Sequence, residues 1–454
     1  MHYFYDKTGY DFLEDAYSGG GGFKDGRYLI PHPREDYEKL LNRKELAYYS
    51  NFVKPVVDSL TNPIFRKPIA RDWEGQSHYL SSFLEDVDKL GSSMNRFMKK
   101  ATRLARLHGS IFIVVDNTAE LDKTVAEAKQ KRAFPYLYMI KPNQVLEYQC
   151  DRFGVLASIT YEVSNAYNKS FGGVNINNDV ETWTWDKNNW ECKKGDTVVA
   201  GGTNELGIVP IIPFLGVDAE IGDLLPTSPM LSIARTNLQI YNLCSELREI
   251  LRNQAFAVLC YPITEKVSID KAQNGIRIGT DTLLPFDGET KSIPCFIAPS
   301  AEPATLIQTE IARLIEDIYR QANLTSVVSV QTKTSGVAKQ WDFEQTNQNL
   351  SDMAEMCELV ERGIIKLFAL RTASTINYKV VYPRDFGIVD VRAELDKVAA
   401  ALDLNVGNEF NKEVKIKAVD TYLTSISDDR YDEIITDIQN DIDDLKFTKS
   451  EDDS

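Results

Sequence analysis

The stretch over residues 302–371 constrains the fold most strongly, because it predicts two amphipathic helices separated by a short polar segment. In both helices the apolar residues recur at steps of three and four, which places them on one face. The second helix is predicted to run unbroken over 337–371, a length of about 50 Å at about 1.5 Å per residue. Residues 325–336 between them are rich in hydroxyl and β-branched side chains, which favour extended or turn backbone. A plain helical hairpin and a larger helical framework would both satisfy this pattern.

The two apolar faces must pack against other parts of this chain or against another chain. The face of the first helix consists of Leu306, Ile307, Ile311, Leu314, Ile315, Ile318 and Tyr319. The face of the second helix consists of Leu350, Met353, Cys357, Val360, Ile364 and Leu367.

The charge balance excludes one class of function. With 51 basic and 67 acidic residues the formal net charge is -16, whereas proteins that grip nucleic acid by neutralising phosphates need clustered Lys and Arg. An acidic chain is compatible with a conduit through which DNA slides. No apolar run approaches the roughly 20 residues of a membrane span, and the N-terminal sequence has no signal-peptide layout. We therefore expect a cytoplasmic chain with no membrane partner.

Catalytic and metal-binding patterns are missing from the sequence. The six cysteines form no CxxC pair, and the four histidines have no metal-ligand spacing. The sequence contains no P-loop, no Gly-x-Ser-x-Gly elbow and no HExxH motif. We therefore predict a protein that is not an enzyme and has no metal site and no cofactor.

The first hundred residues predict an arm followed by helices. Residues 1–35 contain four consecutive glycines and two prolines, which indicates a flexible arm. A helical pattern over residues 34–60 should be kinked or interrupted by Pro55. The next helical pattern carries the strongest basic run of the chain, and it predicts a solvated face or a subunit interface rather than a DNA groove. The run consists of Arg96, Lys99, Lys100, Arg103 and Arg106.

A β-rich block follows and extends to about residue 199. Residues 110–115 predict a buried strand, residues 118–132 a polar helix, and the short apolar segments after them a series of strands. Three tryptophans at positions 183, 185 and 190 predict sheet packing, with a sugar-binding platform as the less favoured reading. The two prolines of VPIIPF, residues 209–214, exclude an ordinary central strand.

Residues 229–257 predict a helix with two usable faces. One face is apolar, and the other carries Arg235, Gln239, Asn242, Glu246, Glu249 and Asn253. Residues 258–301 break the helical pattern with four prolines and short extended pieces, which predicts a small β-containing insert. After the long helix, TINYKVVYP predicts a strand, and further helices precede an acidic C-terminal tail.

Three segments, taken in order, resemble the portal proteins of tailed bacteriophages. They are RKELAYYSNFVKPVVDSLTNPIFRKPI at residues 43–69, the VPIIPF linker, and the helix, loop, SGVAK and long helix of residues 302–371. The resemblance covers about residues 40–390. It implies an α+β fold, portal-like and mainly helical, with a β-rich wing part, a small clip insert, a long wing helix and a helical crown.

The resemblance divides the chain into seven parts. They are an N-terminal arm and wing (1–228), a first stem helix (229–257), a clip (258–301), a second stem helix (302–323), a tunnel loop (324–336), a long wing helix with a strand (337–390), and a crown with the acidic tail (391–454).

The resemblance also implies the function. Portal proteins form a ring of twelve copies at the capsid vertex, the head-tail connector of the virion, through which double-stranded DNA is packaged and ejected. The implied partners are the terminase large subunit, the head-tail adaptor, and the major capsid and scaffolding proteins, with the chain in the host cytoplasm during assembly. A non-ring structural or scaffolding virion protein is the alternative.

Two sets of residues are the candidate site residues. By its place in the tunnel loop, the set Val328, Gln331 and Lys333 is expected to face DNA, although Lys333 also reads as an ordinary exposed loop lysine. The polar faces of the two stem helices supply the candidates for subunit contacts, which are Arg235, Gln239, Glu246, Arg313 and Arg320.

Overall fold

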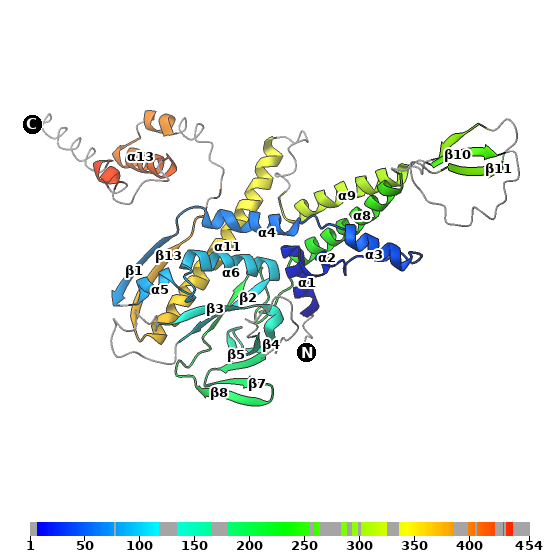
Figure 1. Ribbon diagram of the computed structural model, residues 1–454. Helices are drawn as coiled ribbons and strands as arrows, with labels where there is room; N and C mark the ends of the chain where they lie inside the picture. Colours follow the sequence, from blue (N-terminus) through cyan, green and yellow to red (C-terminus); the bar gives the residue numbers. More distant parts are fainter. Residues whose placement is uncertain are drawn as a thin grey trace, which may run out of the picture. The chain divides into compact units, whose positions relative to one another are not determined.

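The computed structural model of this chain contains two compact units, Met1–Asp385 and Phe386–Ser454 (Figure 1). The residues it describes are 7–76, 79–117, 134–164, 180–254, 258–263, 283–287, 293–297, 301–324, 336–384, 386, 398–404, 406–422, 430 and 433–438. The expected helix at 118–132 and most of the acidic tail lie outside these residues. Within the described residues helices are combined with sheets whose strand pairs are mostly antiparallel, so the α+β class predicted from the sequence is confirmed.

The N-terminal segment is folded rather than a flexible arm, so that expectation is wrong for residues 7–35. The chain forms α1 (Lys7–Ser18) and α2 (Gly21–Lys24), and Leu13, Ala16 and Phe23 are buried in a core that they share with the later helices. The glycine run makes a tight turn, because Gly21 has a φ of +48° and a Cβ there would lie 2.1 Å from the carboxylate of Asp15. Apolar side chains on both sides of the turn hold the segment down.

Two further helices follow the turn. They are α3 (Tyr37–Leu46) and α4 (Val53–Thr61), and a short 3₁₀ turn, η1 (Asn62–Phe65), continues α4. The helical pattern is interrupted, but not by Pro55 as predicted: the break covers residues 47–52, and Pro55 occupies the first turn of α4. A proline is tolerated there because the first N–H groups of a helix have no partner within the helix.

Glu14 on α1 joins the N-terminal segment to the rest of the first unit. Its carboxylate accepts a hydrogen bond from Lys141 Nζ (2.6 Å) and lies 3.4 Å from Nε2 of the buried His108. Burial by itself raises the pKa of Glu14, but its interactions with His108 and Lys141 lower it to about 2. The ionised carboxylate therefore stabilises the folded state.

We expect this contribution to be present above the ordinary glutamate pKa of 4.5 and to be lost as the pH falls toward the folded value of about 2. Because the side chain is 33% exposed, solvent screening limits the contribution to about 1 kcal/mol. Urea unfolding of the wild type and of Glu14→Gln at pH 6 and pH 3 measures it. The free-energy difference between the two proteins should shrink at pH 3, and a difference independent of pH would contradict the assignment.

A three-stranded antiparallel sheet forms the centre of the first unit. Its strand order is β3 (Tyr136–Ile140), β2 (Ser110–Asp116), β9 (Ile211–Leu215), which confirms the buried strand predicted for residues 110–115. Pro213 is tolerated in β9 because β9 is an edge strand and one side of its backbone needs no ladder partner. The VPIIPF segment is therefore in part an edge strand.

Most of the predicted basic run on α6 (Met94–His108) lies at the surface, but the prediction is wrong for Arg106. Its side chain is buried and donates hydrogen bonds to Oδ1 of Asn349 (2.8 Å) and to the backbone oxygen of the same residue (3.2 Å). Burial lowers the pKa of Arg106 to about 10. The position lies on the side of α6 that packs against the long helix, which the basic run alone does not reveal.

The β-rich block is an antiparallel meander of five strands. The strands are β4 (Val145–Cys150), β5 (Leu156–Ser164), β6 (Val180–Asp186), β7 (Asn189–Lys194) and β8 (Thr197–Thr203). Trp190 stacks on both Trp183 and Trp185, with ring centroids 5.7 Å apart in each pair. All three pack on the core between this sheet and the central one, and Trp185 is buried. The structure thus supports the packing reading of the tryptophans.

The long helix α11 (Gly336–Arg371) is continuous, as predicted. The six residues of its predicted apolar face are all buried. The strand β13 (Thr375–Val381) follows it and pairs antiparallel with β1 (Ala70–Gln76) in a separate two-stranded sheet. The sequence predicts β13 but not its partner, because nothing local connects strands that are about 300 residues apart.

In the second unit, described by itself, the longest helix among the described residues is α13 (Asn408–Tyr422). Its described side chains are exposed or partly exposed. Across both units, the described helices include none with the length and apolar character needed to cross a membrane.

Candidate functional site

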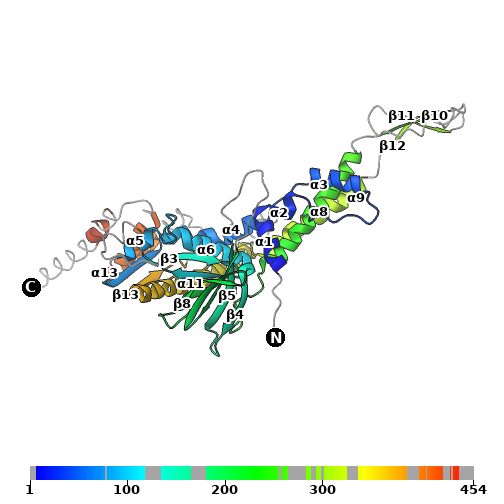
Figure 2. The ribbon, with the colours of Figure 1, turned by 60° about the horizontal axis from the view of Figure 1, so that its bottom comes forward.

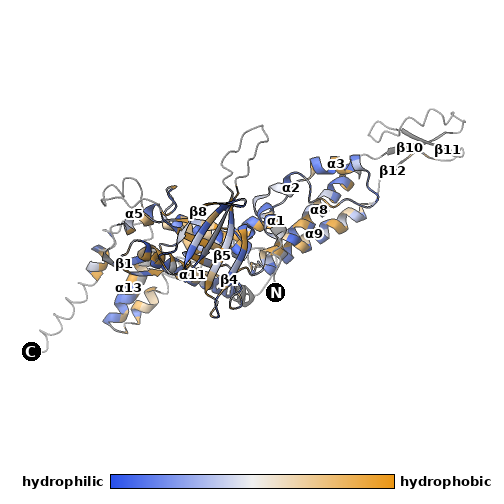
Figure 3. Ribbon diagram, turned by 90° about the horizontal axis from the view of Figure 1, so that it is seen from below, coloured by the Kyte–Doolittle hydropathy of each residue, from blue (hydrophilic) through white to orange (hydrophobic). Residues whose placement is uncertain are grey.

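An antiparallel helical hairpin, α8 (Met230–Gln254) with α9 (Glu302–Gln321), carries most of the predicted site residues (Figure 2). A hydrogen bond from Ser232 Oγ to Gln321 Oε1 (2.9 Å) joins the start of α8 to the end of α9. Leu314 and Ile318 are buried between the helices and the N-terminal segment. Coloured by hydropathy, both helices carry polar and apolar positions around their circumference (Figure 3).

A small three-stranded sheet is inserted between the two helices of the hairpin. In it, β10 (Val258–Ile263) lies between β11 (Leu283–Asp287), which is parallel to it, and β12 (Cys295–Ile297), which is antiparallel. The chain therefore leaves the hairpin at the end of α8, forms this sheet, and returns into α9. A β-containing insert was predicted here, and it is confirmed.

The predicted polar face of α8 has two different parts. Arg235, Gln239 and Glu246 are exposed, as expected of contact candidates. Asn242, however, is buried: its Oδ1 accepts from the backbone N–H of Ile30 (2.8 Å), and its Nδ2 donates to the backbone oxygen of Tyr28 (3.2 Å). The prediction of a solvated Asn242 is wrong because the N-terminal segment covers this side of α8.

Asn237 is a site residue that the sequence reasoning missed. Its side chain is fully buried and accepts hydrogen bonds from Tyr49 Oη (2.6 Å) and from the backbone N–H of Phe52 (3.0 Å). Its Nδ2 donates to the backbone oxygen of Ser50 (2.9 Å). The side-chain amide of Asn237 thus binds the segment between α3 and α4 to the hairpin. An asparagine in the middle of a strong helical pattern, where its propensity is poor, was the available signal.

The contact candidates on α9 are exposed and already paired within the helix. Arg313 is 56% exposed and bonds both Glu310 (2.6 Å) and Asp317 (2.6 Å). Arg320 also pairs with Asp317. Exposed pairs of this kind contribute little to folding, so these guanidinium groups remain able to exchange partners at an interface.

The candidate DNA-facing residues Val328, Gln331 and Lys333 lie outside the described residues. The described chain reaches Leu324 after α9 and begins again with α11 at Gly336. A hydrogen bond from Thr346 Oγ1 to the backbone oxygen of Asn323 (2.6 Å) joins the end of α9 to the long helix.

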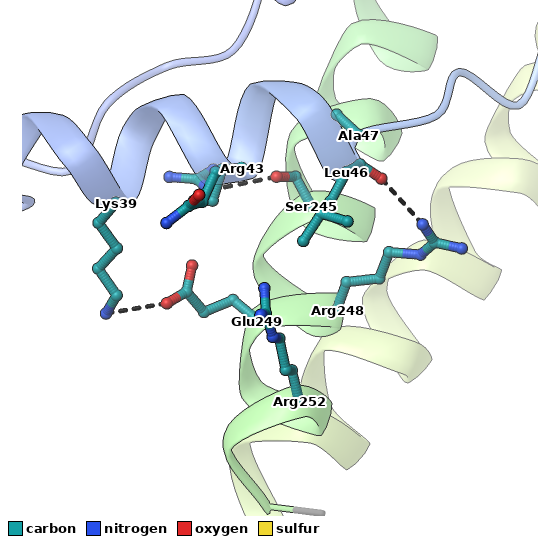
Figure 4. Close-up of a pocket in the computed structure, with 9 residues that line it drawn as sticks. Lys39, Arg43, Leu46, Ala47, Ser245, Arg248, Glu249 and Arg252 are labelled. Atoms are coloured by element: carbon teal, nitrogen blue, oxygen red, sulfur yellow. Dashed lines mark hydrogen bonds and ion pairs between the residues drawn. The ribbon is translucent and has the colours of Figure 1, made fainter. Parts of the chain in front are cut away.

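A groove of about 290 Å³ lies between α3 and the C-terminal half of α8 (Figure 4). Four basic side chains line it, from both helices: Lys39, Arg43, Arg248 and Arg252. The acidic residue in its lining is Glu249, which pairs with Lys39 at 2.9 Å. No local sequence pattern indicates this groove, because its two walls are about 200 residues apart in the chain.

Hydrogen bonds of its own arginines join the two walls of the groove. Arg43 Nη1 donates to both oxygens of Glu35 (3.0 and 2.7 Å), and its Nε donates to Ser245 Oγ (3.2 Å). Arg248 Nη1 donates to the backbone oxygen of Leu46 (2.8 Å), the last residue of α3. The second nitrogen of Arg43, Nη2, is buried and has no hydrogen-bond partner among the described residues.

A charged network joins the long helix to the two-stranded sheet. Glu361 on α11 is fully buried and receives hydrogen bonds from Arg71 on β1 and from Tyr378 and Tyr382 at β13. Burial first, and then the neighbouring negative charge of Glu361, raise the pKa of both tyrosines. Both hydroxyl groups therefore remain protonated donors at neutral pH.

The described residues contain no cluster of three or more His, Cys, Asp or Glu side chains that could hold a metal ion. All six cysteines are free thiols. Cys295 in β12 is exposed.

Comparison with known proteins gives similarity only at the level of solved structures. No protein-family model matches the sequence, and no curated protein is significantly similar to it. A chain of the virion of a native gene transfer agent overlaps with 89% of this chain and 98% of its own length, at 12% identity and a TM-score of 0.46. A chain of the neck of an empty gene transfer agent particle gives the same coverage and identity, with a TM-score of 0.45.

An HK97-family phage portal protein from Corynebacterium diphtheriae overlaps with 76% of this chain and 93% of its own length, at 12% identity and a TM-score of 0.36. Over most of its length, this chain is similar to chains of gene-transfer-agent particles and to a phage portal protein.

Proposed function

We propose that this chain is a phage portal protein, the subunit of a ring-shaped channel at a capsid vertex through which double-stranded DNA is packaged and ejected. The observation that carries the proposal is the order of elements in the hairpin region. A long helix leads into a small sheet, a second helix returns antiparallel to the first, and a 36-residue helix follows after a short connection. This is the order of stem, clip, stem, tunnel loop and wing helix that the sequence resemblance implies.

Both helices of the hairpin support a ring. Each carries exposed polar residues as well as a buried face, so one hairpin can contact a neighbour on either side. Such contacts are heterologous, and they close into a ring when the rotation between neighbours divides a full turn. We propose twelve copies, with Arg235, Gln239 and Glu246 on α8 and Arg313 and Arg320 on α9 among the contacts.

The remaining partners follow from the same role. The terminase large subunit and the head-tail adaptor would dock on the ring, and the capsid and scaffolding proteins would surround it. The chain would assemble in the host cytoplasm and remain in the virion. Energy for packaging would come from the terminase, because this sequence contains no nucleotide-binding motif.

Negative-stain imaging of the purified protein, with native mass spectrometry, tests the proposal. We expect closed rings with a central hole and a single dominant copy number. If the ring forms only within a capsid precursor, the purified protein will not show it, so material extracted from capsid precursors is imaged in the same way. Monomers or dimers in both preparations would contradict the portal role and favour a non-ring structural or scaffolding protein.

The same rings test the proposal that Val328, Gln331 and Lys333 face DNA. Lys333 would add about one phosphate contact per subunit at most, so Lys333→Ala should reduce the slope of log affinity against log salt by up to about 0.9 for each subunit whose lysine binds a phosphate. The measurement is binding of a short DNA duplex to purified rings over a range of salt concentrations. Lys366→Ala, an exposed position on α11, is the control, and equal slopes for the two variants would exclude Lys333 from the DNA-facing set.

A further inference from the structure

The groove between α3 and α8 is a basic site on an acidic chain. Lys39, Arg43, Arg248 and Arg252 line it, whereas the whole chain has a formal net charge of -16. Glu35 and Glu249 compensate two of these four charges through the pairs with Arg43 and Lys39. The groove therefore keeps an excess of positive charge that suits a carboxylate.

One nitrogen in the groove has an unused hydrogen-bonding capacity. Arg43 is 7% exposed, yet its Nη2 has no hydrogen-bond partner among the residues that the structure describes. A buried donor without a partner costs about 1–3 kcal/mol. A carboxylate that enters the groove would satisfy this donor once the side chains that cover Nη2 move aside.

Exposed apolar side chains surround the basic groove. Leu46 is 48% exposed at its edge, and Tyr48 beside it is 49% exposed with Arg248 stacked over its ring at 4.3 Å. An occupant that fits must therefore offer an apolar side chain beside its carboxylate.

The exposed face of α9 offers an acidic and an apolar side chain, and both lie as far along the hairpin as the groove does. Leu306 is 66% exposed, and Glu302, one turn before it, is exposed as well. From the Ser232–Gln321 hydrogen bond, Arg248 is 16 residues along α8 and Leu306 is 15 residues back along α9. At about 1.5 Å per residue, both lie about 23 Å from that bond, and Arg252 and Glu302 both lie about 29 Å from it.

The equal distance of the groove and of these α9 side chains along the hairpin matters for contacts within a closed ring. Copies related by rotation about one axis have equivalent atoms at equal heights along that axis. When the hairpin runs along the axis, a surface of one copy can contact only those residues of the next copy that lie at its own height. The groove and the Glu302–Leu306 turn satisfy this condition.

We infer that the groove between α3 and α8 receives the first turns of α9 from a second copy of this chain, with Glu302 entering between Arg43 and Arg252 and Leu306 packing on Leu46. The inference rests on the proposed ring and specifies one of its contacts. It adds α3, which the sequence-based contact candidates do not include.

Cysteine cross-linking within full-length rings tests this contact. In a Cys295→Ser background, the pair Leu46→Cys and Leu306→Cys should form disulfides between neighbours on oxidation, giving a ladder of covalent oligomers on a denaturing gel. The matched control is Leu46→Cys with Ala312→Cys, since position 312 is also exposed and lies about 9 Å further along α9. This control pair should give little ladder.

Imaging of the same samples separates the inference from the ring proposal. A ladder from the first pair alone supports the inference. Rings that give no ladder from the first pair, or an equal ladder from both pairs, overturn it and leave the ring proposal standing. Absence of rings and of ladders overturns both.

Exchanging the charges of Arg252 and Glu302 gives an independent test of this contact. Arg252→Glu should raise the protein concentration at half-maximal ring assembly about tenfold, and the double variant Arg252→Glu with Glu302→Arg should return it close to the wild-type value. Lys366→Glu on α11 is the control for the change in net charge. An unchanged assembly of Arg252→Glu, as expected if the groove takes a different partner protein, overturns the inference, and so does a double variant that is not restored.

Discussion

Replacement of Glu361 by glutamine is expected to lower the free energy of unfolding of the first unit by roughly 3–5 kcal/mol, the cost of leaving a buried charge without its partner. Arg71 Nε and Nη2 donate to the two oxygens of Glu361 at 2.6 and 3.0 Å. Tyr378 and Tyr382 each donate to the same carboxylate at 2.6 Å. Glutamine has nearly the same shape, but it carries no charge, and its NH₂ group is a donor that would face the donors of Arg71, Tyr378 and Tyr382.

Urea unfolding measures this loss, and hydrogen exchange shows where it acts. The amides of β1 and β13 should exchange faster in Glu361→Gln, because the network joins these strands to α11. Glu355→Gln is the matched control: Glu355 lies on the same helix, is 63% exposed and pairs with Arg384 at 3.3 Å, so its loss should cost less than about 1 kcal/mol. If the two variants unfold alike, the buried network does not have the role assigned to it.

Replacement of Asn237 by alanine is expected to cost about 2–4 kcal/mol, because it leaves buried polar groups without partners at about 1–3 kcal/mol each. The backbone N–H of Phe52 and the backbone oxygen of Ser50 lose their hydrogen bonds. Tyr49 Oη no longer donates to Asn237 (2.6 Å) and retains only its hydrogen bond to the backbone oxygen of Ala16 (3.0 Å). The segment between α3 and α4 should therefore detach from α8 more readily.

Limited proteolysis between α3 and α4, together with urea unfolding, measures this effect. Gln239→Ala on the exposed side of the same helix is the control and should change the unfolding free energy by less than about 0.5 kcal/mol. Cleavage at the wild-type rate in Asn237→Ala would show that other contacts hold the segment. Because α3 forms one wall of the basic groove, the same variant should also reduce cross-linking between positions 46 and 306.

The sequence was sufficient for the elements with long, regular periodicity. The continuous helix α11 was predicted with its buried face, since six apolar residues at alternating steps of three and four can share one side only in a helix. The strands β2 and β13 and the β insert between α8 and α9 were also predicted. Local pattern and chain order are enough for such elements.

The expectations that were wrong concern residues whose environment depends on distant parts of the chain. The glycine run at positions 19–22 indicated flexibility, but the apolar residues around it are buried against helices that come later in the sequence. Arg106 was assigned to a solvated face or a subunit interface and Asn242 to the polar face of its helix, but both are buried by elements more than 200 residues away in the chain. Hydrophobic periodicity does not reveal which polar residues will find buried partners.

By itself, the sequence determined the fold class, the order of helix, β insert, helix and long helix, and the exposed charged candidates on the hairpin. Only the tertiary structure decided that the N-terminal segment covers α8, that Asn237 and Glu361 hold distant elements together, and that four basic side chains meet in one groove. The physical reason is that periodicity is a property of neighbouring residues, whereas these contacts join residues from about 190 to 290 positions apart and form only when the apolar faces have packed.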